Sequence, residues 1–581
     1  MIDKQTIGLC LSGGGHRATA FSLGALLYLA DVGRHQQVSV VSSVSGGSLT
    51  NGFLATCDKP LHEQTPKDVE DVVKTLAHGL TGRPQLFWPT TGVVGAVFVL
   101  WFLHLTGQLS FGLSFWETQL TLVATLWLVA LLAGKLIGGT FWGWWGSWMY
   151  LGLMLAALVV GVAIWWLNAH FILRFIVSFL AFSTPLLRCR IAEMAFAATI
   201  FKGKRSHFKL SELSKKSPAT RFVFCATEMY TGQHAWFTHE FINIPLVGLA
   251  KPRNLTVKSA VQMSANFPVA FPYRLRWSSK YHFYLSALPA QQWPSCLLFT
   301  DGGVYDNMAT SWFKKGPQLA VELQDRLRTE DDLGKVQRED YLDLDQWINA
   351  MKVAPDVLIV VNSSEAYKLT WFHPMEEGAG NSCERYNWKH AVQVLFPSPA
   401  AQALLPVWGE ARMLVSVNNC MYNHLGDDQK RSLRRQFLLQ PKTGALVSIG
   451  EPPMHLLVSL VNQWLCERLL LDHELVQQDV EALRARALRI WHRDKDRTKK
   501  ASELLYRINS QEVATTFRPL SKTTTATLLA NGYLSAMINC HLLLDFPMVD
   551  EVPPFEDFER LAEGIPRQGR PTELMEAANS R

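Results

Sequence analysis

A long apolar block lies inside this chain, from about Trp88 to Leu187, with charged sequence on both sides. Its fully charged residues are Glu117, Lys135 and Arg174. The cores of water-soluble proteins rarely run so far without charge, so transmembrane helices are favoured, with a set of buried core helices as the alternative. Each of four apolar stretches has about the 17–25 residues that a helix needs to cross a hydrocarbon core. They are Gly92–Leu113, Thr118–Gly138, Phe141–Leu167 and Phe171–Leu187.

The position of this block constrains the topology. If the sequence on both sides builds one domain, the chain must cross the membrane an even number of times. Four crossings fit, and two crossings with re-entrant segments are the alternative. Both flanks are basic, which by the positive-inside bias predicts a multi-pass integral membrane protein whose remaining, catalytic domain is on the cytoplasmic side, at the inner or plasma membrane if the source is bacterial. The basic residues are Lys67, Lys74, Arg83, Arg188, Arg190, Lys202, Lys204 and Arg205.

The first of three loops that could carry chemistry is Ser12–Gly15. It joins an apolar run, Ile7–Leu11, which is typical of a buried parallel strand, to a helical pattern from Arg17 to about Gly33. Glycines there let successive backbone N–H groups converge, and the helix N-terminus adds partial positive charge. The loop could therefore hold a phosphate or an oxyanion, or be only a tight turn. No Gly-Lys-Ser/Thr follows, so nucleotide binding is disfavoured.

The second loop follows a strand expected at Val38–Ser42 and contains the sequence "SVSGG", residues Ser43–Gly47. Ser45 has the small-x-Ser-x-Gly spacing of a nucleophile elbow, a sharp turn that exposes a hydroxyl above the sheet. Ser43 stands where the usual pattern has Gly. A chance match is the alternative for this motif in isolation.

The third loop begins with Asp301, after a strand expected at Cys296–Thr300. A carboxylate at the carboxyl end of a strand in an open α/β sheet lies where such folds place their sites. Asp301 could orient and deprotonate the Ser45 hydroxyl, or be a solvated Asp-Gly turn. Asp306 is a rival carboxylate, and His16 is the histidine nearest in sequence to the loops, although nothing singles it out as a base.

Together these loops resemble those of the patatin-like phospholipase family. The motifs that carry the resemblance are Ser12–Ala18 ("SGGGHRA"), Ser43–Gly47 and Asp301–Asn307 ("DGGVYDN"), with support from Cys225–Gln233 and Val257–Tyr273. Two positions depart from the family pattern, because Ser43 and Ala18 each stand for a Gly. The resemblance covers Ile7–Cys57 and Arg188–Asn362. It implies an α/β fold, a three-layer α/β/α hydrolase core with a mostly parallel sheet, here interrupted by an α-helical transmembrane insertion.

The resemblance also implies the site. Ser45 would be the nucleophile and Asp301 the base of a Ser–Asp dyad that hydrolyses fatty-acyl esters through an acyl-enzyme, as phospholipases and lysophospholipases do. The implied oxyanion-hole donors are the backbone N–H groups of Gly13, Gly14, Gly15 and Gly46. The implied supporting residues are Arg17, Gly47, Gly302 and Gly303. We expect no cofactor and no metal.

The remaining expectations concern organisation and partners. Nine dispersed Cys residues without a CxxC pair argue against a zinc site or disulfide framework and fit a reducing compartment. No secretory signal pattern begins the sequence. The expected partners are the lipid bilayer and a membrane lipid substrate, with no nucleic acid; nothing assigns an oligomeric state. The expected domains are residues 1–87 and 188–370 (the two parts of the catalytic domain), 88–187 (the insertion) and 371–581 (a mainly helical extension packing on the core).

The carboxyl-terminal third is less informative about function. Pro355–Ser364 is expected to be the last strand of the sheet, and Thr525–Leu544 a packing helix interrupted near Gly532. The basic run Arg484–Lys500 is compatible with a contact to anionic headgroups or with a solvated helix face. Two other functions stay open: a non-catalytic lipid-binding scaffold, and a regulated membrane-damaging effector. Phospholipid, lysophospholipid and neutral glyceride are all compatible substrates.

Overall fold

A computed structural model of the chain describes the following residues, together with a few isolated positions between them: 5–81, 203–266, 273–289, 292–329, 338–363, 428–440, 442–450, 481–490, 520–549 and 551–568. The chain divides into two compact units, and the described elements belong to the unit formed by Met1–Gly92, Pro185–Glu365 and Lys430–Arg581. The expected transmembrane insertion lies outside the described residues, and both the insertion and the domain boundaries stay predictions.

Ten strands lie within the described part of the chain: β1 (Ile7–Leu11), β2 (Val38–Ser43), β3 (Arg221–Glu228), β4 (Gln233–Phe237), β5 (Ile242–Ile244), β6 (Gly248–Ala250), β7 (Arg274–Trp277), β8 (Cys296–Asp301), β9 (Val357–Asn362) and β10 (Gly444–Ser448). The helices described are α1 (Gly15–Asp31), α2 (Ser45–Ala55), α3 (Pro66–Thr81), α9 (Leu213–Lys216), α10 (Val257–Ser264), α11 (Ser311–Thr329), α12 (Arg338–Lys352), α19 (Lys522–Leu544) and α20 (Phe555–Glu563). A 3₁₀ turn, η8 (Gly302–Val304), follows β8. Residues 428–439 and 481–490 are also helical.

The strands form one mixed sheet, in which five neighbours, β10-β9-β1-β2-β3, run parallel. Their apolar runs are buried on both faces, which is typical of parallel strands covered by helices. β4, β5 and β6 extend the sheet antiparallel from β3. The prediction that Pro355–Ser364 is the last strand is wrong, because β10, from the carboxyl-terminal third, pairs with β9 through Ala445 opposite Ile359.

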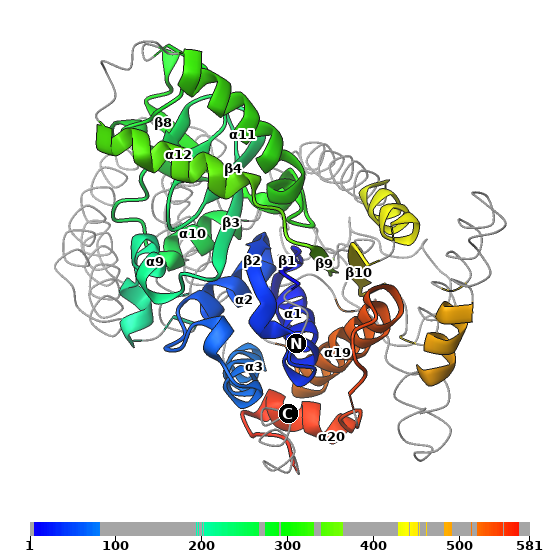
Figure 1. Cartoon of the computed structure of the whole chain (residues 1–581). Helices are drawn as coiled ribbons and strands as arrows, with labels where there is room; N and C mark the ends of the chain where they lie inside the picture. The colour runs from blue at the N-terminus through cyan, green and yellow to red at the C-terminus, as the bar shows by residue number, and fades with distance from the viewer. Residues whose placement is uncertain are drawn as a thin grey trace, which may run out of the picture. The chain divides into compact units, whose positions relative to one another are not determined.

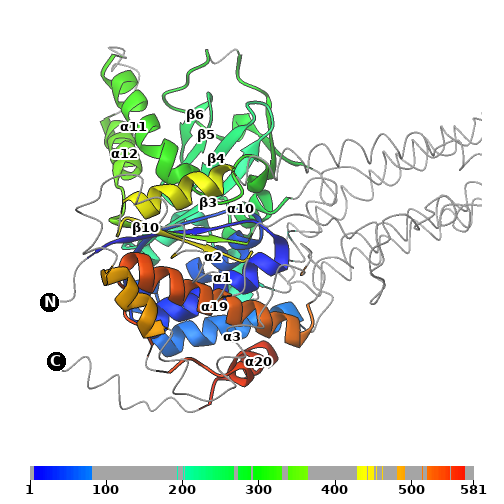
Figure 2. The same cartoon turned by 90° about the vertical axis from the view of Figure 1, so that its right-hand side faces the viewer.

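Helices cover both faces of this sheet, so the α/β/α architecture expected from the sequence is confirmed (Figures 1 and 2). One face carries α1, α3 and α19, and its apolar cluster includes Phe21, Leu76 and Tyr533. The other face carries α11 and α12, with Trp312 and Trp347 in its cluster. In Figure 2 the sheet is seen from the side between these two helical layers. The three loops that could carry chemistry follow β1, β2 and β8, which are strands of this sheet.

Strand β3 brings two distant parts of the chain together. On one edge it pairs with β4 along Phe224–Glu228. The other edge is shared: β2 occupies its first half, with Ser43 opposite Phe224, and β8 its second half, with Asp301 opposite Ala226. β2 is parallel to β3 and β8 is antiparallel, so their carboxyl ends approach each other head-on. Two residues of β3 span about 7 Å, so the turns after β2 and β8 are neighbours.

Helix α1, which begins at the glycine loop, packs closely on α19. A Cβ on Gly24 would lie 2.1 Å from the Leu529 carbonyl oxygen, and one on Gly532 would lie 2.1 Å from the Phe21 carbonyl oxygen. Each glycine therefore lets the backbone of one helix reach the other. The predicted interruption near Gly532 is wrong, because α19 runs unbroken from Lys522 to Leu544. Although α19 is long and apolar enough to cross a membrane, 94% of its most apolar window is buried, so it is a core helix.

The contacts of Gly532 predict that replacing it by Ala destabilises the protein, the opposite of the usual effect of this substitution inside a helix. Ala is about 0.5–1 kcal/mol better than Gly inside a helix. We expect Gly532→Ala to lower the melting temperature instead, by the equivalent of about 2 kcal/mol or more, because its Cβ would overlap the α1 backbone. The matched control is Gly79→Ala on α3, where nothing lies within 4 Å of the added Cβ, and which should raise the melting temperature. Stabilisation by both substitutions would contradict this close packing.

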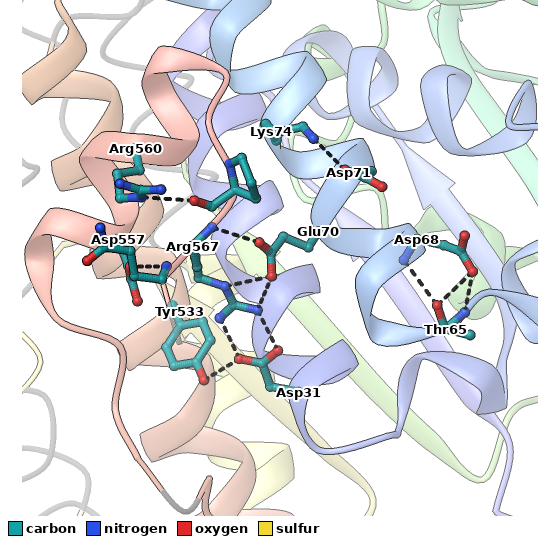
Figure 3. A network of polar contacts seen from close by, with 12 residues as sticks. Asp31, Thr65, Asp68, Glu70, Asp71, Lys74, Tyr533, Asp557, Arg560 and Arg567 are labelled. Atoms are coloured by element: carbon teal, nitrogen blue, oxygen red, sulfur yellow. Dashed lines mark hydrogen bonds and ion pairs between the residues drawn. The ribbon is translucent and has the colours of Figure 1, made fainter. Parts of the chain in front are cut away.

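A buried ion network holds the end of the described chain against α1 and α3 (Figure 3). The Arg567 guanidinium donates to both Asp31 carboxylate oxygens at 2.9 and 3.1 Å and to Glu70 Oε2 at 2.9 Å. The Tyr533 hydroxyl also donates to Asp31 Oδ2, at 2.8 Å. The side chain of Asp31 is fully buried and that of Arg567 is 3% exposed. This network connects the last residue of α1 to α3, α19 and the segment after α20.

Removing the cation from this network should be costly, because it leaves carboxylates buried without their partner. We expect Arg567→Met to lower the free energy of unfolding by about 3–5 kcal/mol, measured by denaturant titration. Arg560→Met is the control, since the Arg560 side chain donates to the exposed Pro566 carbonyl and the substitution should cost under about 1 kcal/mol. Equal losses in the two variants would show that Arg567 contributes no more than a surface arginine.

Candidate active site

Ser45 lies at the turn between β2 and α2 and has a left-handed backbone, with φ of 50°. A non-glycine residue in this region carries strain, and such strain is common at functional turns. The turn is held from α10, because the Ser45 N–H donates to Ser264 Oγ at 3.2 Å. Ser264 in turn donates to the Cys225 carbonyl at 2.6 Å, which connects the elbow to β3. Ser45 is 5% exposed, so it is almost fully buried.

The two glycines after Ser45 are required by the backbone around them. A Cβ on Gly46 would lie 2.0 Å from the Gly15 carbonyl oxygen, and one on Gly47 would lie 2.4 Å from the Leu11 carbonyl oxygen. The Gly47 N–H donates to the Ser12 carbonyl at 3.1 Å. These contacts press the first turn of α2 against the glycine loop, so that the two motifs form one structure.

Ser43, which stands where the family pattern has Gly, belongs to a buried hydroxyl cluster. Its Oγ accepts hydrogen bonds from Ser48 Oγ at 2.9 Å and from Asn51 Nδ2 at 2.7 Å, and it donates to the Val223 carbonyl at 3.3 Å. Ser48 also contacts Ser264 at 2.7 Å. The extra hydroxyl is thus fully hydrogen-bonded, which explains how a Ser fits at this position.

Asp301 ends β8 with its carboxyl group directed at the same place. Its Oδ1 accepts the Gly303 N–H at 2.7 Å, whereas its buried Oδ2 accepts no hydrogen bond of standard geometry from the described residues. Burial raises the pKa of Asp301 to about 7, opposed by hydrogen bonding from the Ser45 side chain and from the Gly303 N–H. The Ser45 hydroxyl therefore lies near enough to act on this carboxyl, and Oδ2 is the oxygen left to receive its proton.

The rival carboxylate, Asp306, is engaged elsewhere. It accepts hydrogen bonds from the Met308 N–H at 3.0 Å, the Thr310 hydroxyl at 3.1 Å and the Ser311 N–H at 2.7 Å. Asp306 therefore shapes the turn that leads into α11. His16 is buried in the first turn of α1.

The glycine loop offers fewer donors than the sequence predicts. The Gly13 N–H already donates to the Asn307 carbonyl at 2.9 Å, so its inclusion among the oxyanion-hole donors is a wrong prediction. Gly14 and Gly15 have left-handed φ values of 139° and 60°. Within the described residues, the N–H groups of Gly14, Gly15 and Gly46 donate no hydrogen bond. These three amides stay available for an anion.

Electrostatics favour negative charge at this point. α1 begins at Gly15 and α2 at Ser45, so two helix N-termini meet where the hydroxyl lies. Each contributes roughly half a positive charge. Thr19 Oγ1 donates to the Gly46 carbonyl at 2.8 Å and fixes one terminus to the other. The arrangement suits a transient oxyanion next to Ser45.

Arg17 supports the loop through main-chain contacts. Its guanidinium donates to the Ser363 carbonyl at 2.8 Å and to the Val513 carbonyl at 2.7 Å. The Ser363 N–H donates back to Ser12 Oγ at 2.6 Å. The end of β9 and the glycine loop are therefore held together.

Two residues that contribute to the site were not predicted individually from the sequence. Ser264 receives the Ser45 N–H, and Asn307 receives the Gly13 N–H through its carbonyl while its side chain fills the space beside Gly13 and Gly303. The available signal was their position, since both lie in stretches that carry the family resemblance. No group of three His, Cys, Asp or Glu side chains that could hold a metal occurs among the described residues.

The comparisons with known proteins identify the family. A model of the patatin-like phospholipases matches residues 9–311, just over half of the chain. The chain therefore belongs to the patatin-like phospholipase family. Among solved structures it is similar to VipD from Legionella pneumophila, at 12% sequence identity and a TM-score of 0.24. That match covers 63% of this chain and 51% of VipD, so this chain spans about half of that one. The chain matches no curated protein.

The raised pKa of Asp301 predicts a pH-dependent stability. The folded protein binds this proton more tightly than the unfolded chain, where an Asp titrates near 3.8, so the stability that it contributes below pH 4 is lost as the pH rises through about 7. Asp301→Asn removes the buried charge and should therefore be more stable than the natural protein at pH 8, by a few kcal/mol at about 1.4 kcal/mol for each pKa unit. The difference should vanish near pH 4.

Melting temperatures measured from pH 4 to pH 8 test this prediction. Asp58→Asn is the control, because Asp58 is exposed and its replacement should leave the pH dependence unchanged. Parallel curves for the natural protein and the Asp301→Asn variant would mean that the Asp301 carboxyl is solvated or already ionised without cost.

Proposed function

We propose that this protein is a membrane-embedded serine lipid acyl hydrolase of the phospholipase or lysophospholipase type, with Ser45 and Asp301 as its catalytic dyad. The observation that carries the proposal is the shared edge of β3, where Ser43 pairs opposite Phe224 and Asp301 opposite Ala226. That register brings a hydroxyl at a strained turn and a carboxyl with an unused oxygen to one point. Family membership supplies the class of reaction.

Acylation begins when Ser45 Oγ attacks the carbonyl carbon of a fatty-acyl ester and its proton passes to Asp301 Oδ2. A pKa of about 7 suits a general base at neutral pH, because about half of the carboxyl groups are then ionised and the carboxylate is basic enough to accept the proton. The tetrahedral intermediate then collapses, the proton moves from Asp301 to the leaving alcohol oxygen, and an acyl-enzyme forms on Ser45. No separate histidine is needed for this transfer.

The N–H groups of Gly14, Gly15 and Gly46 would stabilise the oxyanion of the intermediate. They donate no hydrogen bond within the described residues, and they lie at the N-termini of α1 and α2. Removing one such donor typically costs about 2.7–4 kcal/mol of transition-state stabilisation. Hydrolysis of the acyl-enzyme repeats the sequence with water: Asp301 accepts a water proton, the oxygen attacks the acyl carbon, and the fatty acid leaves as the proton returns to Ser45 Oγ.

The membrane assignment rests on the sequence of residues 88–187 and its basic flanks. In the sequence, this block lies between the Ser45 elbow and β3. Spanning helices inserted there would hold the site beside the bilayer on the cytoplasmic side, so that a lipid substrate need not cross water. The lipid bilayer and a membrane lipid are thus the proposed partners.

Fatty-acid release from phospholipid and lysophospholipid vesicles tests the dyad. We expect Ser45→Ala and Asp301→Asn each to lower the rate by about 1,000-fold or more, because the nucleophile or its base is lost. Ser39→Ala, on the same strand β2 but away from the turn, should leave the rate unchanged. Undiminished release by Ser45→Ala would overturn the proposal, and a folded natural protein that releases no fatty acid would favour a lipid-binding scaffold.

A further inference from the structure

A buried histidine lies behind the turn that carries Asp301. His234, on β4, is 3% exposed and both of its ring nitrogens are hydrogen-bonded. Nε2 lies 2.6 Å from the Gly302 carbonyl oxygen, and Nδ1 contacts Ser311 Oγ at the start of α11. None of the steps described above uses this side chain. Its contact with the Asp-Gly-Gly turn is nevertheless direct.

The neighbours of His234 determine where its proton lies. A carbonyl oxygen can only accept, so Nε2 carries the hydrogen. The Trp236 indole can only donate, and it donates to Ser311 Oγ at 3.2 Å, so the Ser311 hydroxyl keeps its own hydrogen for an acceptor such as Nδ1. Burial lowers the pKa of His234, and Asp306 and the Gly302 carbonyl only partly restore it, which favours the neutral ring. In either protonation state Nε2 donates to the Gly302 carbonyl.

The peptide that receives this hydrogen bond also contacts the catalytic carboxyl. The Gly302 carbonyl and the Gly303 N–H belong to one planar peptide unit. That N–H donates to Asp301 Oδ1 at 2.7 Å. His234 and Asp301 are thus joined through a single peptide, whose carbonyl oxygen also accepts the Tyr305 N–H at 3.1 Å and the Asp306 N–H at 3.2 Å. Hydrogen bonds in series polarise one another, so donation from Nε2 makes the Gly303 N–H a stronger donor.

We propose that His234 is a positioning residue that acts on the Asp301 carboxylate through the peptide between Gly302 and Gly303. It holds the plane of this peptide so that the Gly303 N–H faces Oδ1 and Oδ2 stays free for the Ser45 proton. The same contact favours the ionised form of the base. The inference rests on the proposed role of Asp301 as general base, and it adds a group that tunes the base without touching the substrate.

Other groups that could influence this site also face His234. Among the described residues, the titratable or charged ones are Asp306, Lys315, Tyr305, whose ring centroid lies 4.7 Å from that of His234, and Cys225, which reaches the site through Ser311. Burial raises the pKa of Cys225 to about 12, so the thiol is neutral. The influences on the pKa of Asp301 are burial, Ser45 and Gly303. A change at His234 can therefore reach Asp301 through the peptide.

The experiment measures the rate constant for labelling of Ser45 by a fluorophosphonate as a function of pH, which needs no knowledge of the natural lipid. The labelling rate of the natural protein should rise with pH to a plateau, with a midpoint near 7, as Asp301 ionises. His234→Leu and His234→Asn should move this midpoint upward by about half a unit or more, because Leu has no donor and the Asn amide is too short to reach the Gly302 carbonyl. His234→Gln, whose amide nitrogen can replace Nε2, should restore it.

The matched control is His239→Leu. His239 is a second buried histidine, close after β4, and its Nε2 lies 3.6 Å from Glu240 rather than near the Asp-Gly-Gly turn. It should leave the midpoint unchanged. An unchanged midpoint in whichever of His234→Leu and His234→Asn folds, judged by its melting transition, would overturn the inference, as would an equal shift in His239→Leu.

The two proposals fail in different ways. If labelling of the natural protein does not depend on Ser45 or shows no rise with pH, the proposed dyad fails. If labelling depends on Ser45 and rises with a midpoint near 7 but the His234 variants behave as the natural protein does, the role of His234 fails alone.

Discussion

The geometry of the site depends on one edge of β3 that two strands share. β2 runs parallel to β3 and ends at Ser43, and β8 runs antiparallel and ends at Asp301. Their pairing partners, Phe224 and Ala226, are two residues apart. A hydroxyl from one turn and a carboxyl from the other are therefore neighbours because of strand register, although more than 250 residues separate them in sequence. Everything proposed about the dyad follows from that register.

Close backbone contacts keep these turns in place, and they come at some cost in stability. Gly46 lies so close to the Gly15 carbonyl that position 46 tolerates no side chain, and Gly24 and Gly532 let α19 pack on the helix that begins at the glycine loop. The Arg567 network then holds the far end of the same helix (Figure 3). The burial that raises the pKa of Asp301 destabilises the folded protein at neutral pH, and tight packing elsewhere offsets such a cost.

Much of this arrangement could be predicted from sequence, since apolar runs end at β1, β2 and β8 and each is followed by glycines. These local patterns were enough to place Ser45 and Asp301 at turns. The contributions that were missed all depend on contacts between distant segments. Nothing local shows that the Gly13 N–H is used by Asn307, that β10 extends the sheet, or that Gly532 receives the α1 backbone. His234 carries no motif, and only its hydrogen bond to Gly302 reveals it.

The most direct measurement is a crystal structure of the fluorophosphonate adduct. The account predicts phosphorus bonded to Ser45 Oγ after loss of fluoride, with its phosphoryl oxygen about 2.7–3.1 Å from the backbone nitrogens of Gly14, Gly15 and Gly46 and with Asp301 Oδ2 beside the Ser45 oxygen. A covalent bond to another residue would contradict the account. So would an adduct on Ser45 whose oxygen points away from these amides, or one in which Asp301 lies beyond hydrogen-bonding reach.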